Sequence, residues 1–177
     1  IHNQAAILKE LKIENYEKLL EFEEKVLPGD STNREGHAAK VYFNLLFGKK
    51  FIRGEDNYIN NSLDYGYAII LSTMNKEIVS KGYITQLGIN HRSEFNQFNL
   101  ACDLMEPFRP LVDKIVYENS NLELNRNQKY KLIDVLNNKV EIGNKEQYVG
   151  NAIPIYIQSV FDSLESEKEI KILNYEL

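Results

Sequence analysis

The sequence of 177 residues contains no tryptophan and only one cysteine. A single cysteine excludes an intrachain disulfide, and Cys102 lies among apolar neighbours, which indicates a buried side chain in a reduced, cytoplasmic protein. No apolar run approaches the roughly 18 to 20 residues that span a bilayer. A Walker-type glycine-rich loop, CxxC pairs and a GxSxG elbow are also missing. These absences argue against a membrane span, nucleotide hydrolysis, structural zinc and serine hydrolysis.

Strand-like alternation is nearly absent too, and most of the chain carries apolar residues at helical spacing. With 43% hydrophobic and 27% charged residues, the composition fits one globular domain, whose predicted class is all-α. Proline, glycine and capping residues mark the helix ends. The predicted helices cover residues 1 to 27, 34 to 47, 56 to 80, 94 to 105, 108 to 119, 125 to 136 and 152 to 164. Residues 139 to 147 form a small hairpin or a turn.

The net charge of −5 argues against a generally basic nucleic-acid binder. The charges are unevenly distributed, however. Residues 34 to 53 carry five basic side chains and one acidic side chain, Glu35. This basic segment is therefore a candidate surface for an anionic partner.

A narrow polar stripe is predicted on an otherwise apolar helix. Asn96, Asn99, Asp103 and Glu106 follow one another at spacings of three or four residues, which places them on one helix face. The neighbouring side chains are mostly apolar. The stripe is either a thin solvated face or the polar wall of a functional cleft that holds a cation.

Glu35 and His91 each allow a structural and a functional interpretation. Glu35 completes the pattern Thr32-x-x-Glu35, which is typical of a helix capping box. His91 follows the segment GYITQLGIN, which is predicted to be a loop, and it is a metal ligand, a general base or a structural histidine. Spacing alone identifies no metal site.

Three segments resemble the CRISPR-associated adaptation integrase family, and most closely its bacterial type II members. They are DSTNREGHAAKVYFNLLFG (30 to 48), LDYGYAIILSTMNKEIVSKGYITQLGINH (63 to 91) and FNQFNLACDLMEPFRPLVD (95 to 113). They occur in the family's order. The similarity is looser before residue 28 and after residue 119.

The resemblance implies a catalytic metal site for Mn²⁺ or Mg²⁺ with Glu35, His91 and Glu106 as ligands. Asp103 is implied as a residue that orients a ligand, or as an occasional ligand itself. The resemblance favours the ligand role of Glu35 over the cap, although both roles are compatible before metal binds. Candidate phosphate contacts, each of which is equally interpretable as a surface ion pair, are Arg34, Lys40, Arg53, Arg92 and Arg109.

The implied function is that of a metal-dependent DNA endonuclease and integrase in bacterial antiviral defence. Such an enzyme inserts new spacers into a CRISPR array by transesterification with a 3′-OH. Implied partners are double-stranded DNA of the protospacer and the CRISPR repeat, a second copy in the full-length form, a small ferredoxin-like adaptation protein and type II accessory proteins. The alternatives are a transposon-type integrase and a noncatalytic helical scaffold that binds DNA or protein.

The sequence departs from the family pattern in two ways. The family's β-rich N-terminal domain has no counterpart here, so residues 1–177 are expected to be the C-terminal helical catalytic domain. Within it, residues 30–113 form the basic, ligand-bearing segment and residues 120–177 a looser helical part. Such a domain alone is expected to be weakly active or inactive. Asp64 stands where family members commonly have Asn or Ser, which adds a negative charge.

Overall fold

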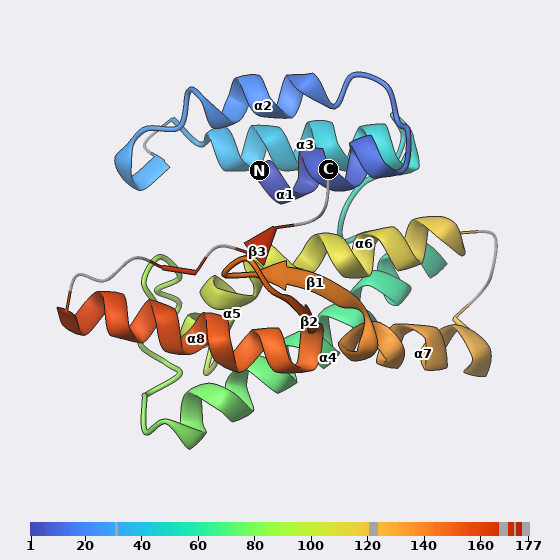
Figure 1. The fold of residues 1–177 in the computed structure, drawn as a ribbon. Coiled ribbons are helices and arrows are strands. Elements are labelled where there is room, and N and C mark those ends of the chain that lie inside the picture. The colour runs from blue at the N-terminus through green and yellow to red at the C-terminus, as the bar shows by residue number, and fades with distance from the viewer. Residues whose placement is uncertain (31, 121–123, 167–169, 172, 175–177) are drawn as a thin grey trace.

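The computed structural model describes residues 1–30, 32–120, 124–166, 170–171 and 173–174. Over these residues the chain is mainly helical, which confirms the predicted class (Figure 1). The helices are α1 (His2–Glu10), α2 (Glu17–Glu23), α3 (Arg34–Phe47), α4 (Tyr58–Ser80), α5 (Asn99–Met105), α6 (Arg109–Glu118), α7 (Arg126–Ile133) and α8 (Val149–Ser166). Short 3₁₀ turns are η1 (Pro28–Asp30), η2 (Glu106–Phe108) and η3 (Asp134–Asn137), and the strands are β1 (Lys139–Ile142), β2 (Glu146–Tyr148) and β3 (Leu173–Asn174).

The long helix α4 is the centre of the main core. It contacts α5, α6, α7 and α8, and its fully buried face includes Leu63, Ile70 and Met74 at helical spacing. At Gly66 a Cβ atom would lie 2.3 Å from Cγ1 of Val112 in α6. α4 and α6 approach each other so closely at this point that only a residue without a side chain fits.

The helices α1, α2 and α3 lie together at the top of Figure 1 and share a smaller hydrophobic cluster. The prediction of one continuous helix up to residue 27 is wrong, because the chain turns between α1 and α2. Lys12 and Asn15 adopt left-handed backbone angles, with φ of 58° and 66°. This turn folds α2 back beside α1, so that Leu8 and Leu19 pack in the same cluster.

The prediction of a helix from residue 94 is also wrong, because α5 begins only at Asn99. Residues 94 to 98 belong instead to the loop that follows α4. The side chain of Asn96 accepts a hydrogen bond from the Phe98 backbone at 2.9 Å, which competes with helix formation. As a result, the loop between α4 and α5 is long enough to reach across the helix that carries Asp103.

A small antiparallel sheet with the strand order β2-β1-β3 is the non-helical part of the described fold. β1 and β2 form the hairpin that the sequence allowed between residues 139 and 147. The third strand was not predicted: Leu173 near the chain end is buried and pairs with Ile142 of β1. Two residues of strand in a charged segment are too short to give a recognisable pattern.

Candidate metal centre

Three segments carry the predicted site residues. Glu35 lies in the first turn of α3, His91 lies in the loop between α4 and α5, and Asp103 and Glu106 lie at the end of α5 and in η2. The start of α3 and the loop are both at the left in Figure 1. The buried faces of α4, α5 and α6 hold these segments in place.

Asp103 fixes the position of His91. One of its carboxylate oxygens accepts hydrogen bonds from the backbone N–H of Ile89 at 2.6 Å and of Asn90 at 2.9 Å. The other accepts from the backbone N–H of His91 at 3.1 Å and faces its Nδ1 at 2.5 Å. Burial would raise the pKa of Asp103, but these donors outweigh it and lower the pKa, so the carboxylate is ionised. In neutral His91 this contact places the proton on Nδ1 and leaves the Nε2 lone pair for a metal.

Two neighbouring residues fasten the same loop. Asn99, which is buried, donates from Nδ2 to the carbonyl oxygens of Gln86 at 3.0 Å and Ser93 at 2.8 Å. At Gly88 a Cβ atom would lie 2.3 Å from the His91 carbonyl oxygen and 2.9 Å from the Asp103 carboxylate, so a side chain does not fit. Two members of the polar stripe, Asn99 and Asp103, therefore hold the histidine loop rather than facing solvent. The sequence showed the stripe but gave no signal that the loop between α4 and α5 would bind to it.

Glu106 is partly exposed and lies in the 3₁₀ turn η2. Its Oε1 forms an ion pair with Nη2 of Arg109 at 3.1 Å. The pKa of Glu106 is raised, chiefly by burial; Arg109 opposes this shift, whereas the negative charge of Glu35 adds to it and His91 lowers it. Glu35 and His91 therefore act electrostatically on Glu106 in the folded chain, although they lie far from it in sequence.

Glu35 is exposed and does not complete a capping box. The N-terminus of α3 is capped by Asp30, whose carboxylate accepts from the backbone N–H of Arg34 at 2.7 Å and of Glu35 at 2.9 Å. Left-handed backbone at Asp30 and Asn33, with φ of 44° and 52°, folds Asp30 back to the helix start. Within the described residues no bond joins the Glu35 side chain to Thr32, so the idea that Glu35 both caps and binds metal is wrong.

Glu106 feels the charges of Glu35 and of His91, but the three predicted ligands do not form a closed set. Among the described residues, no three His, Cys, Asp or Glu side chains surround one ion position. In this state Glu106 is held by Arg109 and His91 by Asp103, while the charges of Glu35 and Glu106 repel each other. The donor set nevertheless fits a divalent cation: two carboxylates and an imidazole suit Mn²⁺ and, less well, Mg²⁺. Their role as ligands of one ion stays a prediction.

The predicted phosphate contacts fall into three groups. Arg34 and Arg109 lie beside Glu35 and Glu106, and each has a buried Nε that finds no acceptor in the described part of the chain. Arg53, in contrast, forms an ion pair with Asp64 and donates to Asn60 at 3.0 Å. The additional charge of Asp64 is therefore matched by Arg53. Lys40 and Arg92 are exposed.

A buried carboxyl group that sequence analysis missed lies behind the site. Asp113 of α6 is 1% exposed and accepts hydrogen bonds from the hydroxyl of Tyr42 in α3, at 2.9 Å, and from that of Tyr67 in α4. Burial raises its pKa to about 7, although both hydroxyls and the guanidinium groups of Arg109 and Arg53 lower it. One acidic residue inside the apolar run PLVDKIV was the only sequence signal.

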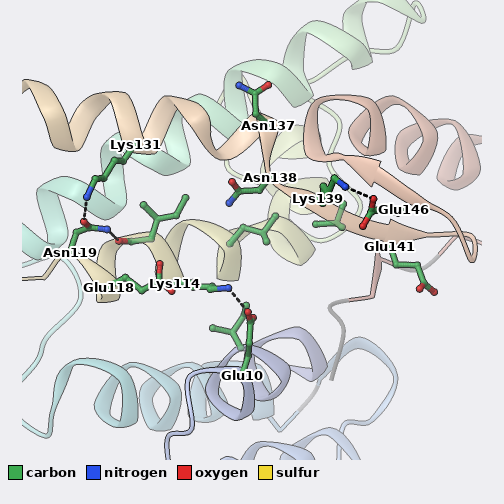
Figure 2. Close-up of a pocket in the computed structure, with 14 residues that line it drawn as sticks. Glu10, Lys114, Glu118, Asn119, Lys131, Asn137, Asn138, Lys139, Glu141 and Glu146 are labelled. Carbon is green, nitrogen blue, oxygen red and sulfur yellow. Dashed lines mark hydrogen bonds and ion pairs between the residues drawn. The ribbon is translucent and has the colours of Figure 1, made fainter.

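A cavity of about 750 Å³ lies elsewhere, between α1, α6, η3 and the sheet, and contains none of the predicted ligands (Figure 2). Its three lysines already have partners in the chain: Lys114 contacts Glu10, Lys131 contacts Asn119, and Lys139 contacts Glu146. The cavity also holds further glutamates, Glu118 and Glu141. It is therefore poorly suited to a polyanion, and the candidate centre remains at Glu35, His91 and Glu106.

The family model described as CRISPR associated protein Cas1 matches residues 1–134. The chain belongs to the Cas1 family. This confirms the resemblance that the three sequence segments indicated. The chain is similar to the CRISPR-associated endonuclease Cas1 of Neisseria meningitidis serogroup C. The two are 42% identical over 123 residues, which are 67% of this chain and 40% of that protein. A Cas1 endonuclease of Francisella tularensis subsp. novicida is 28% identical over 144 residues, 74% of this chain and 45% of that protein.

Solved structures show the same fold. A Cas1 protein from Thermotoga maritima superposes with a TM-score of 0.77 at 19% identity, over 93% of this chain and 62% of that one. A casposase bound to its integration product superposes with a TM-score of 0.73 at 22% identity, over 99% of this chain and 66% of that one. The chain thus spans less than half the length of the two curated Cas1 relatives. No described helix is both long and apolar enough to cross a membrane.

Proposed function

We propose that this Cas1-family chain carries the catalytic centre of a metal-dependent DNA endonuclease and integrase that inserts spacers into a CRISPR array. The observation that carries the proposal is the contact between Asp103 and Nδ1 of His91, which leaves Nε2 of His91 available. The charges of Glu35 and His91 also act on Glu106 and shift its pKa in opposite directions. Glu35, His91 and Glu106 would hold Mn²⁺ or Mg²⁺. Residues 1–177 would act as the C-terminal helical catalytic domain.

The proposed reaction is transesterification. A 3′-OH oxygen attacks a phosphorus atom of the target strand, and the bond from that phosphorus to its former 3′ oxygen breaks, so no covalent enzyme intermediate is needed. A bound divalent cation would supply charge stabilisation at the phosphodiester. Asp103 would keep His91 in one tautomer and orientation throughout. Arg34 and Arg109, whose buried Nε groups are unpaired in the described chain, would donate to phosphate oxygens.

The proposed substrates are double-stranded protospacer DNA and the CRISPR repeat. Further proposed partners are a second copy of the protein, a small ferredoxin-like adaptation protein and type II accessory proteins. Support comes from family membership and from the fold shared with a casposase whose structure contains an integration product. The basic segment of residues 34 to 53 begins beside Glu35 with Arg34 and continues along α3.

A strand-transfer assay tests the proposed function. The full-length protein that contains this chain is incubated with Mn²⁺, labelled duplex DNA with free 3′-OH ends and a plasmid that carries CRISPR repeats, and single-end joining is measured. Glu35→Ala, His91→Ala and Glu106→Ala are each expected to lower joining by two or more orders of magnitude. His37→Ala, on the same exposed helix start as Glu35, and Glu141→Ala, in the separate cavity, serve as matched controls that should retain it.

The assay also separates the alternatives. Equal joining to a plasmid without repeats would favour a transposon-type integrase, and DNA binding without any joined product would favour a noncatalytic scaffold. Joining that is unchanged in all three ligand variants would refute the proposed centre. Only single-end products are expected from the chain alone, so concerted insertion of both ends would contradict its proposed role as a domain that needs further parts.

A further inference from the structure

Arg109 links the candidate centre to the buried network behind it. Its side chain is one third exposed, and its guanidinium binds Glu106 through Nη2 at 3.1 Å. The same guanidinium lies over the ring of Tyr67, 5.1 Å from the ring centroid. Its Nε is buried and has no acceptor in the described part of the chain. In Arg109, Nη2 is thus engaged by Glu106, one face of the guanidinium lies on the Tyr67 ring, and Nε is without a partner among the described residues.

Tyr67 gives this guanidinium a fixed support. The Tyr67 hydroxyl donates to Asp113, which is fully buried and also accepts from Tyr42. Beside it, Gly66 brings the backbone of α4 against Val112 of α6, so α4 has little freedom to move relative to α6. The guanidinium consequently stays close to Glu106 even when its ion pair is broken.

We propose that Arg109 is the internal counter-ion of Glu106 before metal is bound, and that Glu106 exchanges Arg109 for the divalent cation. Arg109 then presents its donors, supported on Tyr67, to a DNA phosphate. This inference rests on the proposed function, because it assigns a metal-dependent role to a residue of that same site. Arg109 is thus a competitor of the metal and a metal-dependent contact of the DNA.

Charge explains why the exchange is expected. Glu106 is partly desolvated and feels the negative charge of Glu35, so it requires a nearby cation, and Arg109 is the one in contact with it. Once a divalent cation takes this place, a guanidinium at the same carboxylate is repelled, and its Nε and Nη donors need another anion. A phosphate accepts two such donors in parallel.

Arg53 offers a matched control within the same network. Its guanidinium also lies over Tyr67, 5.4 Å from the ring centroid. Its ion-pair partner, however, is Asp64 and not Glu106. Removing Arg53 therefore removes a guanidinium from the Tyr67 ring without releasing Glu106.

Mn²⁺ affinity without DNA is the first measurement, made on the 177-residue chain by calorimetry or by the electron paramagnetic resonance signal of free Mn²⁺ at pH 8. Arg109→Gln is expected to bind Mn²⁺ roughly three- to tenfold more tightly than the wild type, because a competing cation is removed. Arg53→Gln and Arg109→Lys, which keeps a cation beside Glu106, are expected to stay close to the wild type. Glu106→Gln is expected to weaken binding.

Binding of a short duplex DNA is the second measurement, made with and without Mn²⁺. Arg109→Gln is expected to lower DNA affinity when Mn²⁺ is present. It is expected to change DNA affinity little when Mn²⁺ is absent, because without the metal Arg109 is held in its ion pair with Glu106. Unchanged or weaker Mn²⁺ binding by Arg109→Gln, with Glu106→Gln still impaired, would overturn the exchange and leave the proposed function intact. A wild-type chain that binds no Mn²⁺, or a Glu106→Gln variant that binds it normally, would refute both.

Discussion

At the scale of single residues, Asp103 holds the histidine loop of the candidate centre through both of its carboxylate oxygens. Its two oxygens accept from three consecutive backbone N–H groups and face the His91 imidazole. These contacts hold the loop so that Nδ1 of His91 faces Asp103 and Nε2 is not engaged by that carboxylate. The predicted orienting role of Asp103 thereby has a structural basis, whereas the ligand roles of Glu35, His91 and Glu106 depend on the family resemblance.

Asp103→Asn is expected to loosen the His91 loop, because the amide keeps one acceptor oxygen and turns an NH₂ group toward backbone donors. Loss of these bonds from a mostly buried carboxylate is expected to lower the free energy of unfolding by about 1 to 3 kcal/mol. Thermal or denaturant unfolding measures the loss, and ¹⁵N relaxation of residues 89 to 91 measures the added motion. Glu94→Gln, an exposed change in the same loop, should leave both unaltered. A loop that is as rigid in Asp103→Asn as in the wild type would contradict the assigned role.

Residue-scale features divide into those that sequence can and cannot reveal. The stripe of Asn99, Asp103 and Glu106 followed from helical spacing alone. The partner of the stripe did not, because the loop bonds connect residues 86 to 93 with residues 99 and 103 through backbone groups, which every residue type carries. The cap by Asp30 was missed for a related reason. Left-handed backbone at Asp30 and at Asn33, which the pattern Thr32-x-x-Glu35 does not indicate, brings Asp30 to the helix start.

At the scale of helices, Asp113 joins the three elements that support the centre. It lies in α6 and accepts from Tyr42 of α3 and Tyr67 of α4. These bonds set the relative positions of the helix that carries Glu35 and the helix that follows Glu106. A shift of α3 along α6, which would displace Glu35, would therefore also break a buried hydrogen bond.

Asp113 is expected to make stability depend on pH. Its pKa is raised to about 7 in the folded chain, compared with about 3.9 for an unfolded aspartate. Between these values the folded state holds a proton that the unfolded state has lost, so stability falls as pH rises from about 4 to 7 and then levels off. Asp113→Asn removes this proton exchange. The variant is therefore expected to lose less stability than the wild type between pH 5 and pH 8.5.

Unfolding midpoints of both proteins at the two pH values measure this difference. The comparison cancels the contributions of groups that the substitution leaves alone. Parallel pH profiles for the wild type and Asp113→Asn would show that Asp113 is ionised in the folded chain throughout the range, contrary to the expectation.

The helices themselves were predictable where local signals and packing agree. Residues 34 to 47 and the end of α4 at Ser80 were predicted, because glycines that follow each helix adopt positive φ angles there: 95° at Gly48 and 82° at Gly82. The break between α1 and α2 was not predicted, because both pieces continue one amphipathic pattern. Both α1 and α2 pack against α3, and this tertiary contact leaves no signal in a short stretch of sequence.

At the scale of the whole molecule, the core and the candidate centre differ in polarity and in charge. The main cluster is apolar and built around α4, while the centre concentrates Glu35, Glu106 and Asp103 at one edge. The clustered negative charge is tolerated through Arg109 and through the loop donors. A bound divalent cation would relieve it further, so binding is expected to raise the stability of the entire fold.

Mn²⁺ at about 100 times its dissociation constant is expected to stabilise the fold by about 2.7 kcal/mol, a rise of roughly 5 to 10 °C in Tm for a chain of this size. Differential scanning fluorimetry with increasing Mn²⁺ checks the shift. Glu106→Gln is expected to show a much smaller rise, and Glu141→Ala a normal one. An equal rise in the wild type and Glu106→Gln would locate the bound Mn²⁺ away from the candidate centre.

The bonds from the loop to Asp103 also decide how that loop opens. Ile89, Asn90 and His91 are exposed, yet their amide hydrogens point at a carboxylate on a core helix. Such amides exchange with solvent hydrogen only when the loop lifts away as a unit or when α5 itself unfolds. Hydrogen exchange of these three amides is therefore expected to be slower than their exposure alone suggests, because opening the loop breaks its bonds to Asp103 of α5.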